Sequence, residues 1–291
     1  MKPFEYVKPN TLAEAISALD AGGEDARALS GGTDLIVQMR AGRNVVGNVI
    51  DVKGVTETNV ISHSKKDGLT IGSSVPCYRI YNDEGIKKTY AGLVDSVSII
   101  GGTGIQGRAS LGGNLCNAAP SGDGIQSLII LGAVANVEGP NGARQIATED
   151  FCTAPGQNAL NPGELLVSLS VPEPESNAGA HYLRFIPRNE MDIAVVGVGA
   201  SVVLDAEKKS IVSARISLAS VAPTPLFVEA AGDALKGTEI ASDSVEKAAI
   251  FAQEAARPID DMRGTADYRL HLVGVLTKRA LKVAIERAEN Q

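Results

Sequence analysis

The sequence is poor in aromatic residues, cysteine and histidine, and each shortage excludes a class of site. Tryptophan is absent and aromatic residues make up 4% of the 291 residues, so aliphatic side chains must form most of the core. The three cysteines, Cys77, Cys116 and Cys152, have no CxxC spacing, whereas iron–sulfur clusters and structural zinc need several converging thiolates. The three histidines lie far apart, outside any HExxH motif. We therefore expect no metal ligands on this chain.

The chain also lacks a long hydrophobic run and an excess of positive charge. Without about eighteen consecutive apolar residues, no membrane-spanning helix is predicted. The first residues contain no apolar segment of the kind found in signal peptides, and the odd number of scattered cysteines favours reduced thiols and a cytoplasmic location. A net charge of −7 argues against a nucleic-acid partner.

Hydrophobic residues make up 44% of the chain, and its 291 residues are enough for two domains. Residues 1–55 are typical of a small α/β unit with a buried strand at 49–52. A helix is expected to start near Asp34, and three of its side chains are expected to point inward, namely Leu35, Ile36 and Met39.

The rest of the chain alternates in the manner of strands before it becomes helical. A hairpin is predicted from 60–62 and 69–71, and further strands at 133–138 and 165–171. The proline-rich segment 172–179 predicts a domain boundary, which gives domains 1–176 and 177–291. Two long strands, 194–204 and 211–221, and two helices, 245–256 and 265–288, are expected in the second domain.

Two glycine-rich turns are the most informative motifs. The first is Ser30-Gly31-Gly32-Thr33-Asp34-Leu35 and the second is Ala109-Ser110-Leu111-Gly112-Gly113-Asn114. Paired glycines let backbone N–H groups approach an anion closely, and a helix N-terminus favours negative charge. One such turn suits a phosphate and two suit a pyrophosphate, as in FAD. Taken alone, each turn is equally consistent with a phosphate-binding loop and with an ordinary structural turn that caps a helix.

Together with their flanks, these turns resemble the FAD-binding subunit of the molybdenum hydroxylases, a family that includes the medium chains of carbon monoxide and xanthine dehydrogenases. The resemblance runs nearly end to end and is carried by residues 28–35, 71–74, 101–123, 162–166, 188–194 and 222–225. It implies an α+β fold. A two-subdomain FAD-binding domain of the vanillyl-alcohol-oxidase/PCMH type, 1–176 with subdomains 1–55 and 56–176, precedes a carbon monoxide dehydrogenase flavoprotein-type α+β domain, 177–291.

The resemblance also implies a function and partners. The chain would be an oxidoreductase subunit that binds FAD non-covalently and accepts electrons from [2Fe–2S] clusters on a small subunit. A large subunit would carry the molybdenum cofactor, in a dimer of heterotrimers. No catalytic residue is identified on this chain. The resemblance further implies that FAD is contacted by Ala28, Leu29, Ser30, Gly31, Gly32, Thr33, Asp34, Leu35, Ser74, Ser110, Gly112, Gly113, Asn114, Asp123, Leu166, Arg184 and Ile193.

Several alternatives stay open. Asp123 suits the ribose hydroxyls of FAD but also suits a helix cap, and Arg184 suits either the flavin or a surface salt bridge. The stretch 104–108 departs from the family pattern, and Arg108 either neutralises a phosphate or is a solvated loop residue.

Two other functions compete with the electron-transfer subunit, namely a stand-alone FAD-dependent reductase of the same fold and a non-catalytic module that has lost its flavin. If the Gly113 backbone approaches the pyrophosphate, Gly113→Val is expected to give a folded protein that has lost most of its flavin. Gly112→Ala is expected to be milder, unless Gly112 needs a positive φ angle.

Overall fold

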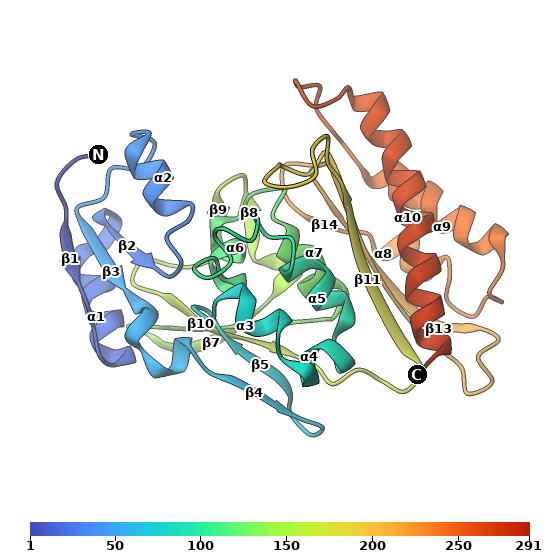
Figure 1. The fold of residues 1–291 in the computed structure, drawn as a ribbon, viewed down its shortest axis with the longest axis horizontal. Coiled ribbons are helices and arrows are strands. Elements are labelled where there is room, and N and C mark those ends of the chain that lie inside the picture. The colour runs from blue at the N-terminus through green and yellow to red at the C-terminus, as the bar shows by residue number, and fades with distance from the viewer.

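Three sheets with their helices lie side by side along the molecule (Figure 1). The computed structural model describes residues 1–291 except the side chain of Ser242. The first sheet and the second sheet form the amino-terminal part, and the third sheet belongs to the carboxyl-terminal part, where the longest helix covers it. The arrangement places the two glycine-rich turns at the junction between the first and second sheets.

The first subdomain is a parallel three-stranded sheet with a helix on each face. The segment α1 (Leu12–Gly22) packs on one face through Ala15 and Leu19, and α2 (Leu35–Arg40) packs on the other through Met39. The strand order is β1 (Glu5–Val7), β3 (Asn48–Asp51), β2 (Ala26–Leu29). The expected inward orientation of Ile36 is wrong, because this side chain is 40% exposed. Successive helical residues point about 100° apart, so a helix that turns Leu35 and Met39 to the sheet turns Ile36 away.

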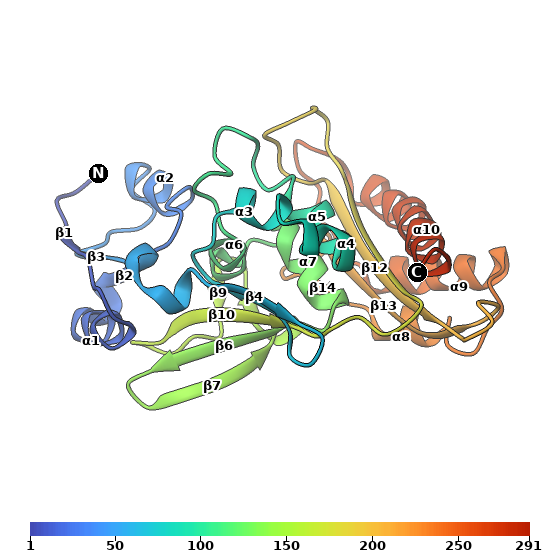
Figure 2. The same cartoon turned by 60° about the horizontal axis from the view of Figure 1, so that its bottom comes forward.

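The second subdomain is an antiparallel sheet covered on one face by short helices (Figure 2). The strand order is β4 (Ile61–Ser64), β5 (Gly68–Gly72), β10 (Leu165–Val171), β6 (Val134–Gly139), β7 (Gly142–Ala147). The helices are α3 (Cys77–Tyr81), α4 (Glu84–Thr89), α5 (Ala91–Val97), α6 (Leu111–Asn117) and α7 (Asp123–Ile130). A two-stranded sheet, β8 (Cys152–Ala154) and β9 (Gln157–Asn158), completes it. The sequence pattern predicted β4, β5, β6 and β10 but not these helices, most of which are shorter than two turns.

The carboxyl-terminal part is a four-stranded antiparallel sheet between two layers of helices. Helix α10 (Ala266–Glu289) covers one face, and α5 and α7 of the second subdomain cover the other. The strands are β11 (Ala178–Phe185), β12 (Val196–Leu204), β13 (Ile211–Ala219) and β14 (Leu226–Phe227), followed by α8 (Glu229–Asp233) and α9 (Ser242–Ala255). Strand β11 starts inside the segment expected to be the linker, because Ala178 already pairs with Val203.

The longest helix, α10, has 24 residues, and most of its charged residues lie on the exposed side, opposite its apolar stripe. In the part of the chain that the structure describes, no helix combines the length and apolar character that a bilayer crossing needs.

Candidate functional site

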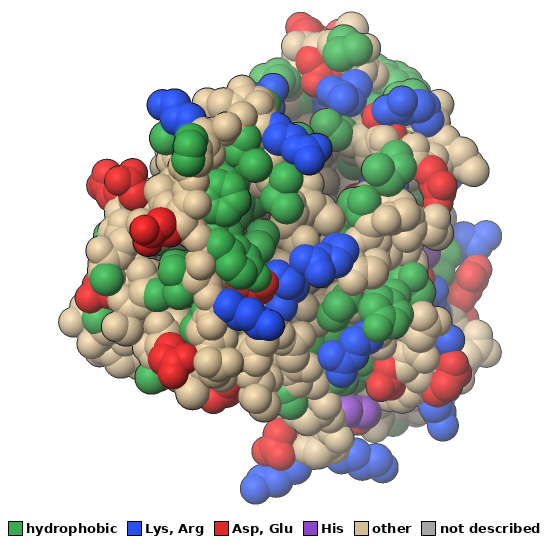
Figure 3. All heavy atoms as spheres, turned by 60° about the vertical axis from the view of Figure 1, so that its left-hand side comes forward, with side chains coloured by type: hydrophobic (Ala, Val, Ile, Leu, Met, Phe, Trp, Pro, Cys, Tyr) green, Lys and Arg blue, Asp and Glu red, His purple; other side chains and the backbone are tan. Residues whose placement is uncertain are grey.

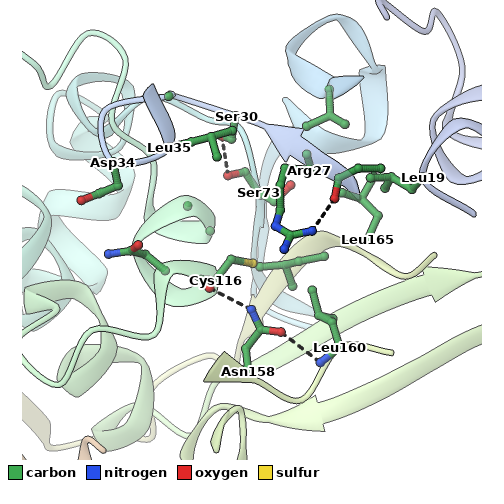
Figure 4. Close-up of a pocket in the computed structure, with 18 of the residues that line it drawn as sticks. Leu19, Arg27, Ser30, Asp34, Leu35, Ser73, Cys116, Asn158, Leu160 and Leu165 are labelled. Carbon is green, nitrogen blue, oxygen red and sulfur yellow. Dashed lines mark hydrogen bonds between the residues drawn. The ribbon is translucent and has the colours of Figure 1, made fainter. Parts of the chain in front are cut away.

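A cavity of about 920 Å³ lies between the first and second subdomains (Figure 4). One wall comes from β2 and α2 with the turn that joins them, and the other comes from α6, β9 and the segment that leads into β10. Its volume is within the range of cofactor pockets. Both glycine-rich turns line this cavity, so the structure brings together two motifs about eighty residues apart.

The first turn presents unpaired backbone donors. The N–H groups of Gly31, Gly32, Thr33 and Asp34 form no hydrogen bond with any described residue. Gly32 has φ +77°, a conformation that glycine adopts without strain. A Cβ at Gly31 would lie 2.2 Å from the carbonyl oxygen of Arg108, so only glycine lets the two turns meet. Four adjacent free donors in a concave loop suit an anion with several oxygen atoms.

The second turn is held by its own serine. Ser110 is the N-cap of α6, and its Oγ accepts a hydrogen bond from the Gly113 N–H at 3.0 Å. The same Oγ lies 2.8 Å from the Oγ of Ser30, so a hydrogen bond joins the two turns directly. The N–H group of Gly112, which lines the cavity, forms no hydrogen bond with the described residues. Donors from both subdomains therefore flank one space.

The two glycines of the second turn have different surroundings. A Cβ at Gly112 would lie 2.6 Å from the Cα and carbonyl oxygen of Ser73, whereas a Cβ at Gly113 would meet, among the described residues, only the Ser110 Oγ at 2.9 Å. Gly112 is therefore packed against the backbone of the turn that follows β5, and both glycines border the cavity. The expectation that Gly112→Ala removes less flavin than Gly113→Val stays a prediction, but the structure adds a packing cost at Gly112, because a backbone neighbour cannot rotate away as a side chain can.

We predict that Gly112→Ala lowers the free energy of unfolding by about 1–3 kcal/mol, the usual cost of overpacking a tight contact. Chemical denaturation of the FAD-free protein measures this change. The matched control is Gly104→Ala, whose Cβ would meet no described atom within 4 Å and which should unfold at the wild-type denaturant concentration. Equal stability of all three proteins would contradict the packing role of Gly112.

The remaining predicted contacts divide between the cavity wall and its surroundings. Ala28, Asp34, Leu35, Asn114 and Leu166 line the cavity, together with the residues of the two turns. Leu29 does not line it and instead packs in the core of the first subdomain. Ile193 is 48% exposed on the connection between β11 and β12, away from the cavity lining.

Ser74 lies outside the lining, but its hydroxyl is notable. The side chain is 3% exposed, and its Oγ has no hydrogen-bond partner among the described residues. Buried hydroxyl groups are nearly always hydrogen-bonded. Its neighbour Ser73 lines the cavity and contacts Gly112. The Ser74 Oγ therefore lacks a hydrogen-bond partner beside the second turn, and a bound polar molecule could supply that partner.

Asp123 and Arg184 form a buried polar group just behind the cavity wall. The Arg184 guanidinium and the Tyr182 hydroxyl both donate to the Asp123 carboxylate, the latter at 2.7 Å. Burial raises the pKa of Asp123 to about 6, although Arg184 and Tyr182 oppose the shift. The group joins the second turn indirectly, because the Gly124 N–H donates to the Asn114 Oδ1 at 3.0 Å. Arg184 is thus in a buried ion pair in this structure and not in a surface salt bridge.

The sequence motifs missed several polar residues of the cavity. Arg27 lies on the wall and donates from Nη1 to the carbonyl oxygens of Glu24 and Ala26, both at 2.7 Å. Gln38 donates to Asn117 Oδ1 across the cavity at 2.9 Å and accepts from Asn44 at 2.6 Å. Spacing gives the available signal for Gln38, because this residue follows Leu35 by about one helical turn and therefore lies on the same side of α2.

Metal ligands are missing from the described residues, where no three His, Cys, Asp or Glu side chains gather closely enough to hold an ion. The three cysteines are free thiols. Cys116 lines the cavity, and burial raises its pKa to about 12. Arg108 does not line the cavity.

Comparisons with known proteins agree with this geometry. Residues 2–174 match the family described as FAD binding domain in molybdopterin dehydrogenase, and residues 181–284 match the CO dehydrogenase flavoprotein C-terminal domain. The chain is 31% identical to the carbon monoxide dehydrogenase medium chain of Afipia carboxidovorans, over 99% of this chain and 98% of the relative. It is 28% identical to a putative xanthine dehydrogenase FAD-binding subunit of Escherichia coli, over 97% and 96%.

Solved structures give the same result. A reconstituted CO dehydrogenase from Oligotropha carboxidovorans contains a chain that superposes with a TM-score of 0.93 at 30% identity, covering 98% of this chain and 99% of that one. Quinoline 2-oxidoreductase from Pseudomonas putida 86 contains one with a TM-score of 0.90 at 28% identity, covering 99% of each chain. The chain therefore belongs to the family of FAD-binding oxidoreductase subunits of the molybdenum hydroxylases.

Proposed function

We propose that this chain is the electron-transfer subunit of a heterotrimeric molybdenum hydroxylase. It would receive electrons from [2Fe–2S] clusters of a small partner subunit and pass them through FAD to an external acceptor. The observation that carries the proposal is the pair of turns with free N–H donors on opposite sides of one cavity, joined by Ser30 and Ser110. Two donor sets at one junction suit the two phosphates of FAD.

The chain's own residues supply binding and orientation. We propose that residues 30–34 and 110–114 hold the pyrophosphate, and that Leu166 and Ala28 provide apolar wall. Ser74 fits because its buried hydroxyl lacks a partner among the described residues. Asp123 and Arg184 would support the second turn from behind and contact FAD only at the edge of the cavity. When bound, FAD supplies the redox chemistry.

The partners and the domain division remain proposals. Several relatives are named as chains or subunits of larger dehydrogenases, which supports a large molybdenum subunit and a small iron–sulfur subunit, in a dimer of heterotrimers. The division into 1–176 and 177–291 is supported by the change from the five-stranded to the four-stranded sheet between β10 and β11. The free thiols support a cytoplasmic location.

Non-covalent attachment of FAD follows from the state of the cavity thiol. Cys116 is the cysteine among the described lining residues, and a pKa near 12 leaves it almost entirely in the unreactive thiol form at neutral pH. We expect acid or heat to release all the flavin into the supernatant, where chromatography identifies it as FAD. Yellow colour that stays in the precipitate would contradict this attachment.

The same preparation distinguishes the competing functions. The purified chain should show flavin absorption bands, and it should not oxidise N-heteroaromatic or aldehyde substrates by itself. A colourless chain that takes up no added FAD would indicate a module that has lost its flavin. Turnover by this chain alone would indicate a stand-alone flavoenzyme.

A further inference from the structure

A second cavity, of about 680 Å³, lies at the junction between the second subdomain and the carboxyl-terminal part. Its walls come from α4, α5, the end of α7 and the last turns of α10, together with residues 172–175 of the linker that runs past α4 to β11 (Figures 1 and 2). We call it the junction cavity. Its lining shares no residue with that of the cofactor cavity. Its size and its position between two parts of the fold are typical of small-molecule sites.

The floor of the junction cavity is a stretch of the four-stranded sheet beyond the end of α7. At that end, the Ser201 Oγ donates to the Ile130 carbonyl oxygen at 2.7 Å. Val203 lies two residues further along β12 on the same face, between Ala178 of β11 and Ser213 of β13, which pair with it. All three residues are half-buried and line the cavity. The space stays open because the side chains of Ala178 and Ser213 are small.

The linker that borders the junction cavity is fixed at both ends. Near its start, the Glu173 carboxylate accepts a hydrogen bond from the Tyr90 hydroxyl at 3.1 Å and lies 2.7 Å from the His63 Nε2. Near its end, the Asn177 carbonyl oxygen accepts from the Leu204 N–H at 3.0 Å. The linker is thus tied to the second subdomain and to β12. The cavity is therefore formed in advance, and a ligand loses little of its binding energy to reorganisation.

The charges around the junction cavity are matched within the protein. Most of the charged lining residues are paired with a described residue, namely Arg287 with Asp95, Arg215 with Glu149, Glu286 with Lys282 and Glu173 with His63. The other two, Lys88 and Glu175, are exposed and opposite in sign. Lys and Arg side chains group together instead on the side of the first subdomain, as Figure 3 shows. An ionic ligand would therefore find no unmatched counter-charge in this cavity.

Two lining residues of β13 keep an unused hydrogen-bond donor. The Arg215 guanidinium donates from Nε to the Ile129 carbonyl oxygen at 3.0 Å and from Nη2 to Glu149 at 2.8 Å. It also lies over the Phe227 ring, 4.1 Å from the ring centre. These contacts hold the group in place, while its Nη1 has no partner among the described residues. The Ser213 hydroxyl has none there either. Both donors suit an acceptor atom on an uncharged ligand.

We propose that the junction cavity binds an uncharged, largely apolar ring compound that carries a carbonyl oxygen or a ring nitrogen. The ring lies on the flat sheet floor at Ala178 and Val203, and its acceptor atom receives a hydrogen bond from Arg215 or Ser213. Because such a ligand touches both parts of the chain, its binding stabilises their contact. The proposal is independent of the electron-transfer function, since this cavity is separate from the cofactor cavity.

Calorimetric titration of the FAD-loaded chain with coumarin, an uncharged bicyclic compound with one carbonyl group, tests the proposal while FAD fills the first cavity. We expect one saturable site. Ser213→Phe and Val203→Tyr, which fill the floor from neighbouring strands, should each weaken binding at least about tenfold. The matched control is Val212→Phe, which should bind within about twofold of wild type, because Val212 is 48% exposed on the other face of β13 and does not line the cavity.

The charged analogue coumarin-3-carboxylate tests the ligand class, and it should bind at least about tenfold more weakly than coumarin. Circular dichroism and FAD content check that each variant is folded, and two filling variants are used so that one folded variant suffices. Absence of saturable coumarin binding, or unchanged binding in a folded filling variant, would refute the site. Equal or tighter binding of the carboxylate would refute the uncharged class. Neither result affects the proposed electron-transfer function, which flavin reduction tests.

Discussion

Gly113→Val should yield a folded protein that has lost at least about 99% of its affinity for FAD, which corresponds to about 2.7 kcal/mol. Gly113 borders the cavity, and its missing side chain would point past the Ser110 hydroxyl into the space between the two turns. A branched side chain there occupies the position of the ligand and disturbs the Ser110 hydroxyl that holds the Gly113 N–H. The fold survives because, among the described residues, no backbone atom from outside the surrounding turns of α6 lies within 4 Å of the new Cβ.

Titration of the FAD-free protein with FAD, followed by quenching of flavin fluorescence, measures this change. The control is Gly104→Val, since Gly104 is a loop glycine with open space around its Cβ position and should keep wild-type affinity. Circular dichroism checks that both variants are folded. Full FAD occupancy of Gly113→Val would show that the second turn is only a structural turn.

The glycine turns could be predicted from sequence because their chemistry is local. Consecutive glycines and an adjacent hydroxyl are visible in residues 30–35 and 110–114, and both segments line the cavity. The longer strands and helices were predictable for a similar reason, since β10 and α10 repeat a clear apolar period over many residues. The α3–α7 helices were not predicted, because such short helices obtain their stability from tertiary packing.

The parts of the site that depend on tertiary contacts could not be predicted. Nothing near Gly112 in sequence reveals that its Cα faces the Ser73 backbone, so the packing cost of a substitution there could not be predicted. The contact of Gln38 with Asn117 joins helices from different subdomains. Asp123 satisfies both a ligand pattern and a helix-cap pattern, and only the fold shows its pairing with Tyr182 and Arg184.

Dependence on partner subunits is the second large effect that we predict. In the electron-transfer function that we propose, substrate electrons reach FAD from the iron–sulfur clusters of another chain, and the described residues of this chain offer no metal-binding cluster of their own. The isolated chain should therefore show no substrate-dependent flavin reduction, although it can still exchange electrons with added dyes. Addition of the other two subunits should restore reduction from zero to a measurable rate, which is a qualitative change.

Stopped-flow absorbance of the flavin band, recorded under anaerobic conditions after mixing with substrate, tests the central claim most directly. The electron-transfer account predicts bleaching of the flavin only when the iron–sulfur and molybdenum subunits are both present, after reduction of the iron–sulfur clusters. Bleaching in the isolated chain, or none in the complete complex while its iron–sulfur clusters become reduced, would contradict the account.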